Sequence, residues 1–170
     1  EGKEKDVSVI TVDFNISAAE NKWTAEPSIT GWTYGENANA PVYGAKFGDV
    51  KIEYKKASEP DSAYTIAVPA NAGDYNVRLS VAATNNFGGL TKALDFTIAK
   101  ASVAIPTVSG KVYTGENLTA DIADGEHYTV SENNGGTEVG RYDVKLKLRD
   151  DPNYYWEGNA EDVSEITVVF

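Results

Sequence analysis

The chain contains no cysteine and only one histidine, His127, among its 170 residues. Without cysteine there can be no disulfide, no thiolate nucleophile and no thiolate metal site. A single histidine cannot build a zinc site, and no serine is marked as its partner in a catalytic triad. Phosphate-binding and dinucleotide-binding glycine motifs are also missing. We therefore expect a protein that is not an enzyme and that needs no metal and no cofactor.

Long hydrophobic runs and positive charge are also scarce. No run approaches the roughly 20 apolar residues that cross a bilayer. Lysine and arginine number 15 against 26 aspartates and glutamates, which leaves a net charge of −11. Such a balance disfavours binding to nucleic acid, because neutralised phosphates supply much of that affinity. The hydrophobic fraction of 41% is ordinary for a folded chain. We expect no nucleic-acid partner and no membrane insertion of this segment.

What the chain does contain is an internal repeat. Residues 31–37 return as residues 110–117, one residue longer, and residues 72–79 return as residues 139–146. Recurrence of this kind is typical of modular arrays. It predicts two domains, residues 1–100 and 101–170. The junction between them has no spacer rich in glycine, proline or serine, so we expect the domains to be held end to end in a fixed orientation.

Apolar residues alternate in steps of two, which predicts β-strands. Besides the strands that carry the inward-facing sets given at the end of this paragraph, strands are expected at residues 50–56, 64–68, 103–108, 118–122 and 127–131. Turn residues separate them at the spacing of a β-sandwich. The chain is thus predicted to be all-β, with two tandem immunoglobulin-like β-sandwich repeats. The inward-facing sets are Tyr75, Val77, Leu79 and Val81; Tyr142, Val144, Leu146 and Leu148; and Leu94, Phe96 and Ile98, with Ile166 and Val168 as counterparts of the last set.

The closing-strand pattern occurs a third time, at Val12, Phe14 and Ile16. Residues 1–18 are therefore either the last strand of a preceding repeat or an extra strand of the first domain. We favour the second interpretation, because an unpaired strand with an apolar face invites aggregation.

A glycine two residues ahead of a tyrosine opens one core strand in each half, at Tyr75 and at Tyr142. The pattern resembles the tyrosine corner of immunoglobulin-like sandwiches. It predicts a ring at the edge of the core and a hydroxyl bonded to the backbone upstream.

Together these residues resemble a known group of repeats. The segments 31–35, 69–75, 85–87 and 94–98 are similar to the MBG and YDG-type immunoglobulin-like repeats of bacterial surface proteins. The resemblance covers residues 27–100 well and 101–170 less well, since Lys111 replaces Trp32 and Thr114 splits the Tyr-Gly pair. It implies an extracellular, stalk-forming or adhesive role at the bacterial cell surface, with neighbouring repeats of the same polypeptide as partners. It brings no catalytic residues.

Binding is the alternative function. Tyr154, Tyr155 and Trp156 replace Phe87 and the two glycines that follow it in the first copy. Three adjacent aromatic residues on a strand cannot all face one side, so at least one should be exposed. With Trp32, they are candidates for stacking on a host glycan or mucin, or for anchoring a protein. The competing interpretation packs them on their own domain or on the neighbouring repeat.

Overall fold

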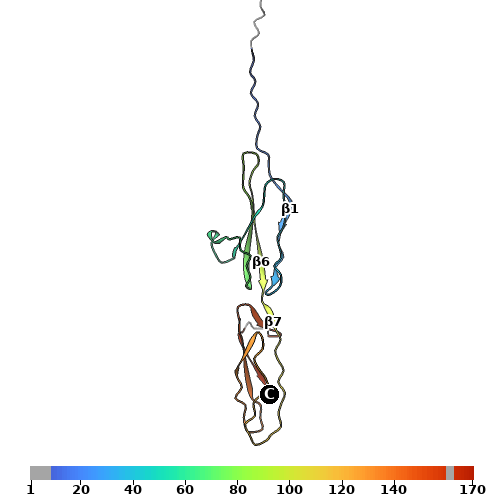
Figure 1. Cartoon of the computed structure of the whole chain (residues 1–170), viewed down its shortest axis with the longest axis vertical. Helices are drawn as coiled ribbons and strands as arrows, with labels where there is room; N and C mark the ends of the chain where they lie inside the picture. Colours follow the sequence, from blue (N-terminus) through green and yellow to red (C-terminus); the bar gives the residue numbers. More distant parts are fainter. Residues whose placement is uncertain (1–8, 160–162) are drawn as a thin grey trace, which may run out of the picture.

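The computed structural model describes residues 9–159 and 163–170, and within them the protein is all-β. Strands form two elongated groups that follow one another along the long axis (Figure 1). We call residues 19–99 the first lobe and residues 101–170 the second lobe. A single turn of 3₁₀ helix, Asp61–Ala63, is the one helical element among the described residues. No helix in this part of the chain has the length and apolar character to cross a membrane.

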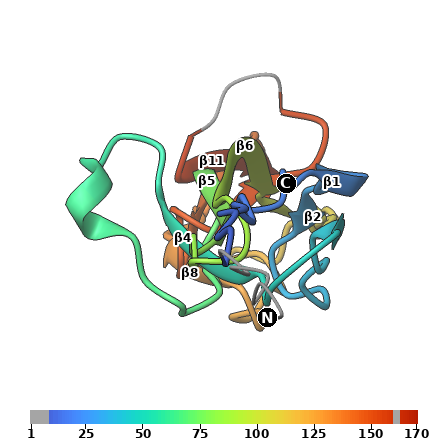
Figure 2. The same cartoon turned by 90° about the horizontal axis from the view of Figure 1, so that it is seen from above.

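The first lobe contains a four-stranded and a two-stranded sheet, seen end-on in Figure 2. In the larger sheet the strand order is β2-β6-β5-β4, and in the smaller one β1 pairs with β3. The long antiparallel pair β5 and β6 sets the register, with Tyr75 opposite Phe96 and Val77 opposite Leu94. The strands are β1 (Trp23–Ser28), β2 (Trp32–Thr33), β3 (Val42–Ala45), β4 (Lys51–Lys56), β5 (Gly73–Val81) and β6 (Leu90–Ala99).

The second lobe repeats this plan with shorter strands. One sheet has the order β11-β9-β8, and β7 pairs with β10 in parallel. Val144 lies opposite Val168 and Leu146 opposite Ile166, so β9 and β11 correspond to β5 and β6. The strands are β7 (Ala101–Val103), β8 (Tyr128–Glu132), β9 (Asp143–Leu148), β10 (Tyr154–Trp156) and β11 (Glu165–Val169).

Each lobe has a hydrophobic cluster of its own. In the first, the Phe96 ring lies 5.2 Å from Trp32, 5.7 Å from Tyr75 and 6.1 Å from Tyr54, measured between centroids. In the second, Trp156 is packed with Val103, Ala120 and the inward residues of β9. The alternation predicted for β5 and β9 is confirmed, because Val77, Leu79, Val144 and Leu146 are all completely buried.

The predicted tyrosine corner is confirmed in both lobes. The Tyr75 hydroxyl donates a hydrogen bond to the Asn71 carbonyl at 2.9 Å, and the Tyr142 hydroxyl donates to the Glu138 carbonyl at 2.7 Å. Gly73 has φ of 145°, a value that favours glycine and allows the chain to turn back under the ring. The corner therefore ties each core strand to the loop just ahead of it.

Three predicted strands are wrong in whole or in part. In residues 64–68 only Thr65 pairs, through a bridge to Tyr54, and Ile66 is exposed. The strand predicted at residues 103–108 is present only at Val103, where β7 ends. Pro106, three residues further on, has no N–H to donate to a β-ladder.

The third of these segments, residues 118–122, keeps only the bridge from Leu118 to Gly136. The Asn133 side chain bonds both the N–H and the carbonyl of Ala120, at 3.0 and 2.9 Å. A side-chain amide thus satisfies backbone groups that a neighbouring strand would otherwise pair.

The preference for residues 1–18 as a strand of the first lobe is also wrong for the described residues 9–18. They form no strand, and Phe14 is 85% exposed. The physical reason is that the closing position of the first lobe is already occupied, because β6 pairs with β5 on one side and with β2 on the other. Residues 1–8 lie outside the described part of the chain.

Replacing Phe96 by alanine tests the first core. Because three aromatic rings pack on this side chain, we expect Phe96→Ala to lower the free energy of unfolding of the first lobe by about 3–5 kcal/mol. Chemical denaturation followed by circular dichroism measures this loss. Thr91→Ala, at an exposed position of the same strand, should change it by less than about 0.5 kcal/mol. A similar loss in both variants would contradict this account of the core.

The stability of the fold at acidic pH should depend on Glu53. Hydrogen bonds from Lys51 at 2.8 Å and Arg78 at 3.0 Å lower the pKa of this carboxyl below its usual 4.5. A lowered pKa stabilises the fold fully above the unfolded-state value, and that stabilisation is lost as pH falls through the folded-state value. Glu53→Gln should therefore flatten the fall in melting temperature below pH 4.5, while Glu26→Gln, at an exposed pair, should not.

Candidate functional site

The two lobes meet without a linker. Strand β6 ends at Ala99 and β7 begins at Ala101, so one residue separates the last strand of the first lobe from the opening strand of the second. The backbone on each side is fixed, since Tyr34 donates its N–H to the Ala99 carbonyl at 2.8 Å and Ala101 donates to the Asn153 carbonyl at 3.0 Å. The predicted absence of a flexible spacer is thus matched by hydrogen bonds on both sides of the connection.

Asn153 is the central polar residue of this junction. Its side-chain oxygen accepts a hydrogen bond from the Ala72 N–H at 2.8 Å, and its amide nitrogen donates to Asp150 at 2.8 Å and to the side chain of Asn71 at 3.4 Å. Asn153 is buried, and a buried amide left without partners would be costly. The bonds to Ala72 and Asn71 cross the junction and therefore form only while the two lobes are in contact.

Aromatic rings form the second part of the junction. The Tyr34 and Tyr154 rings meet edge to face at 5.3 Å, and His127 stacks on Tyr154 at 4.4 Å. The Tyr34 hydroxyl also donates to the Asp150 carboxylate at 3.4 Å. Burial raises the pKa of the Tyr154 phenol, and the nearby Tyr34 and Asp150 raise it further, so the ring stays neutral at physiological pH.

These contacts define two complementary surfaces. We call Tyr34, Asn71 and Ala72 of the first lobe the socket, and Asp150, Asn153 and Tyr154 of the second lobe the plug. The socket includes Asn71, whose carbonyl also accepts the tyrosine-corner bond from Tyr75. The motif that shapes the core of the first lobe therefore also positions the surface that receives the second.

The four residues predicted to bind a ligand do not lie together. Tyr154 is in the plug, while Trp32 and Trp156 are core residues of the first and second lobes, with Trp156 only 1% exposed. The structure corrects the prediction for both tryptophans, because a buried indole cannot stack on a ligand. Tyr155, on the opposite face of β10, is 38% exposed. The prediction that at least one of the three adjacent rings is exposed is confirmed.

Sequence reasoning missed Asn153, Asn71 and Ala72 as functional residues. In the sequence, Asn71 and Ala72 look like ordinary turn residues, and Asn153 is distinguished only as a polar neighbour of three aromatic residues. One available signal was the repeat itself, because Asn86-Phe87 in the first lobe correspond to Asn153-Tyr154 in the second. An asparagine kept beside an aromatic residue at the same loop position indicates a shared contact.

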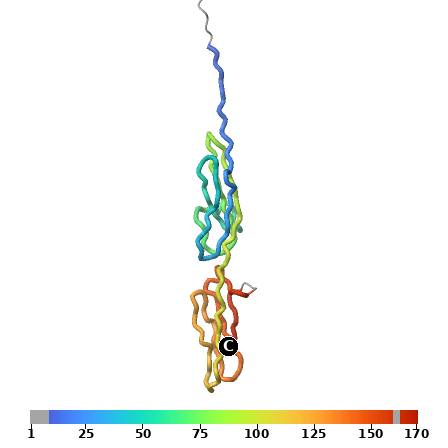
Figure 3. The backbone as a smooth tube through the Cα atoms, turned by 90° about the vertical axis from the view of Figure 1, so that its right-hand side faces the viewer, coloured from blue at the N-terminus to red at the C-terminus, as the bar shows by residue number. Residues whose placement is uncertain are grey.

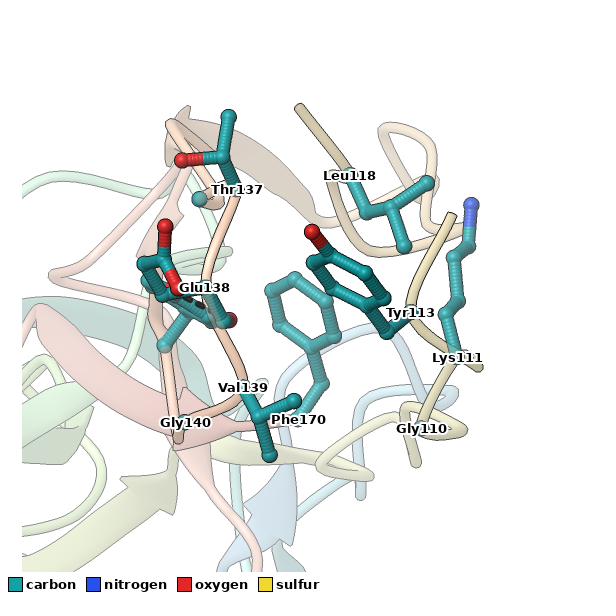
Figure 4. Close-up of a pocket in the computed structure, with 11 residues that line it drawn as sticks. Gly110, Lys111, Tyr113, Leu118, Thr137, Glu138, Val139, Gly140 and Phe170 are labelled. Carbon is teal, nitrogen blue, oxygen red and sulfur yellow. Dashed lines mark hydrogen bonds between the residues drawn. The ribbon is translucent and has the colours of Figure 1, made fainter. Parts of the chain in front are cut away.

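The second lobe carries a counterpart of the socket at the end that faces away from the first. By the internal repeat, Tyr113 corresponds to Tyr34, and Glu138 and Val139 correspond to Asn71 and Ala72. They surround a hollow of about 160 Å³, into which the Phe170 ring projects between Tyr113 and Val139 (Figure 4). Tyr113 is 59% exposed and Val139 87% exposed. This surface, lined by Lys111 and Glu138 as well as by apolar side chains, is a candidate site for a partner shaped like the plug.

No protein-family model matches this chain, and no curated protein and no solved structure was found to be similar to it. Residues 9–159 and 163–170 also contain no group of three or more histidines and carboxylates that could hold a metal ion. The site is therefore best described by its own geometry, as a pair of packing surfaces built from amide groups and rings.

Removing the Asn153 side chain tests this geometry. Asn153→Ala takes away the acceptor of the Ala72 N–H, and a hydrogen bond of this kind contributes about 1 kcal/mol. We expect amide exchange at Ala72 to become about five- to tenfold faster, measured by NMR. The matched variant Asn86→Ala, at the corresponding position of the first lobe, should leave Ala72 unchanged. Equal exchange rates at Ala72 in Asn153→Ala and the unaltered protein would contradict the junction described.

Proposed function

We propose that the chain is a non-enzymatic segment of an extracellular bacterial surface protein, in which each lobe is one immunoglobulin-like repeat and the pair works as a stiff spacer. The boundary between the two domains would then lie near residue 100, with the second domain at residues 101–170, and the role would be that of a stalk or adhesin segment. The observation that carries the proposal is the junction, where the Asn153 side chain and the Tyr34–Tyr154 contact hold two successive lobes in line.

The shape supports a spacer. The lobes lie end to end and the chain runs along the long axis from one to the next (Figure 1). Strand β6 belongs to the main sheet of the first lobe. After residue 100 the chain continues as β7, which pairs with β10 of the second lobe. The hydrogen-bonded strands on either side confine bending to residue 100, and such bending would break the hydrogen bond between Ala72 and Asn153 that crosses the junction. A flexible linker of glycine and serine would carry no such cost.

The acidic, cysteine-free composition agrees with the same role. A net charge of −11 keeps neighbouring copies apart and soluble. The lobes reach stability through aromatic clusters and tyrosine corners rather than disulfides. These properties also agree with the sequence resemblance to repeats of bacterial surface proteins.

Binding of a host glycan, mucin or protein through exposed aromatic residues is the weaker candidate. Of the four residues considered, only Tyr155 presents a ring to solvent at a site outside the junction. Sugar-stacking surfaces and protein hot spots usually combine several groups around a central ring. The described residues around β10 offer no such cluster, so we take the spacer as the principal function.

Small-angle X-ray scattering tests stiffness directly. We expect the unaltered protein to scatter as a single extended particle of fixed length. In the double variant Tyr34→Ala with Asn153→Ala, the radius of gyration should fall and the distance distribution should broaden, because the lobes can bend at residue 100. Tyr155→Ala, outside the junction, serves as the matched control. A flexible ensemble in the unaltered protein would overturn the spacer function.

A further inference from the structure

The sequence near the start of the chain closely repeats the sequence at its end. Residues 5–14 align with residues 161–170 without a gap. The identical pairs are Asp6 and Asp162, Val7 and Val163, Ser8 and Ser164, Ile10 and Ile166, Thr11 and Thr167, Val12 and Val168, and Phe14 and Phe170. Seven of ten positions are therefore the same, whereas residues 5–14 match the region of β6 less closely.

In the second lobe this sequence is the closing strand. Ile166 lies opposite Leu146 and Val168 opposite Val144, and Phe170 exchanges two backbone hydrogen bonds of 3.1 Å with Tyr142. Ile166, Val168 and Phe170 pack against the core, while Glu165, Thr167 and Val169 face outward. The copy at residues 10–14 has the same alternation, but Ile10, Val12 and Phe14 are each at least 80% exposed. Their apolar face has no sheet to cover it.

The segment also enters the first lobe as β6 enters the second. Ala19 pairs in parallel with Phe87, donates its N–H to the Asn86 carbonyl at 2.8 Å and accepts from the Gly88 N–H at 3.2 Å. In the same way Ala101 pairs in parallel with Tyr154 and donates to the Asn153 carbonyl at 3.0 Å. Figure 3 shows residues 9–18 continuing beyond the first lobe along its long axis.

We propose that residues 9–14 are the closing strand of a further repeat of the second-lobe type, which precedes the first lobe in the same polypeptide and docks on it. This inference rests on the proposed function, because it treats each lobe as one repeat. The partner supplies a strand like β9, so that Ile10, Val12 and Phe14 face its leucine, valine and tyrosine. Strands β5 and β9 of this chain cannot take that role, since β6 and β11 already occupy them.

The ends of the two lobes fit the same arrangement. Asn86 and Phe87 of the first lobe correspond to the plug residues Asn153 and Tyr154, and no residue of another lobe covers them in the described structure. The hollow of the second lobe, with Tyr113, Glu138 and Val139, corresponds to the socket. A preceding second-type repeat would present this socket to Asn86 and Phe87. Such a contact is head to tail, and it generates a linear array rather than a closed dimer.

The test is an extended chain in which a second copy of residues 101–160 is placed directly ahead of Lys5. Residues 5–14 of the original chain then stand where the added lobe needs its closing strand. We expect amide exchange at residues 9–14 to slow by at least about a hundredfold relative to the unextended protein, as for strands of a folded core. Mass spectrometry of exchanged peptides measures it.

Two variants of the extended chain separate strand pairing from general folding. Val12→Asp with Phe14→Asp places charges on the inward face and should return residues 9–14 to rapid exchange, with residues 19–170 unchanged. Thr11→Asp, whose counterpart Thr167 faces outward, should keep the protection. Rapid exchange at residues 9–14 in the extended chain, whether or not the added lobe folds, would overturn the proposal.

A second readout uses the absence of cysteine. In the extended chain, Asn86→Cys together with a cysteine at the added copy of Val139 should form a disulfide. The reference is the pair Asn153→Cys with Ala72→Cys in the unextended protein, where the N–H and the side-chain oxygen are 2.8 Å apart. A disulfide that forms in the reference pair but not in the extended chain would contradict the docking of the preceding repeat on the first lobe.

Two further outcomes have separate meanings. Protection of residues 9–14 in the unextended protein that rises with concentration would assign the strand to a second copy of this chain, and would contradict the proposal. Scattering of the unextended protein tests the spacer function without reference to residues 5–14. A stiff pair of lobes with an unprotected strand in the extended chain would thus reject this inference and leave the proposed function standing.

Discussion

The passage from β6 to β7 through a single residue is the constraint on which the rest of the structure depends. One extended segment must satisfy two sheets in succession, first against β5 and β2, and then against β10. Because backbone hydrogen bonds hold the chain up to Ala99 and again from Ala101, the direction of the second lobe depends on the backbone dihedral angles of residue 100. The Asn153 amide and the Tyr34–Tyr154 contact then oppose rotation about that segment.

The tyrosine corner links this constraint to the cores. Tyr75 belongs to the cluster around Phe96, and its hydroxyl holds the Asn71 carbonyl. Asn71 and Ala72 in turn meet Asn153 across the junction. A core residue, a turn and an interface are therefore connected through four residues. The same corner recurs at Tyr142 and Glu138, beside the hollow that Tyr113 and Val139 line.

The sequence predicted the long core strands well, because period-two alternation at Tyr75 to Val81 and Tyr142 to Leu148 reports burial directly. The strand prediction was wrong where a side chain, and not a neighbouring strand, bonds the backbone. At Ala120 the Asn133 side chain bonds both the N–H and the carbonyl. The prediction for Trp156 was also wrong, since composition shows that a ring is present but not which side of a three-residue strand faces the core. The junction residues were missed because Asn153 acts through contacts with residues far away in the chain.

Residual dipolar couplings measured on both lobes of the unaltered protein test the central claim most directly. If the junction holds the lobes as one rigid body, couplings from residues 19–99 and from residues 101–170 will fit a single alignment tensor of one magnitude and orientation. Two tensors that differ in magnitude would show that the lobes reorient independently, and would contradict the account of Asn153 and the Tyr34–Tyr154 contact as a fixed joint.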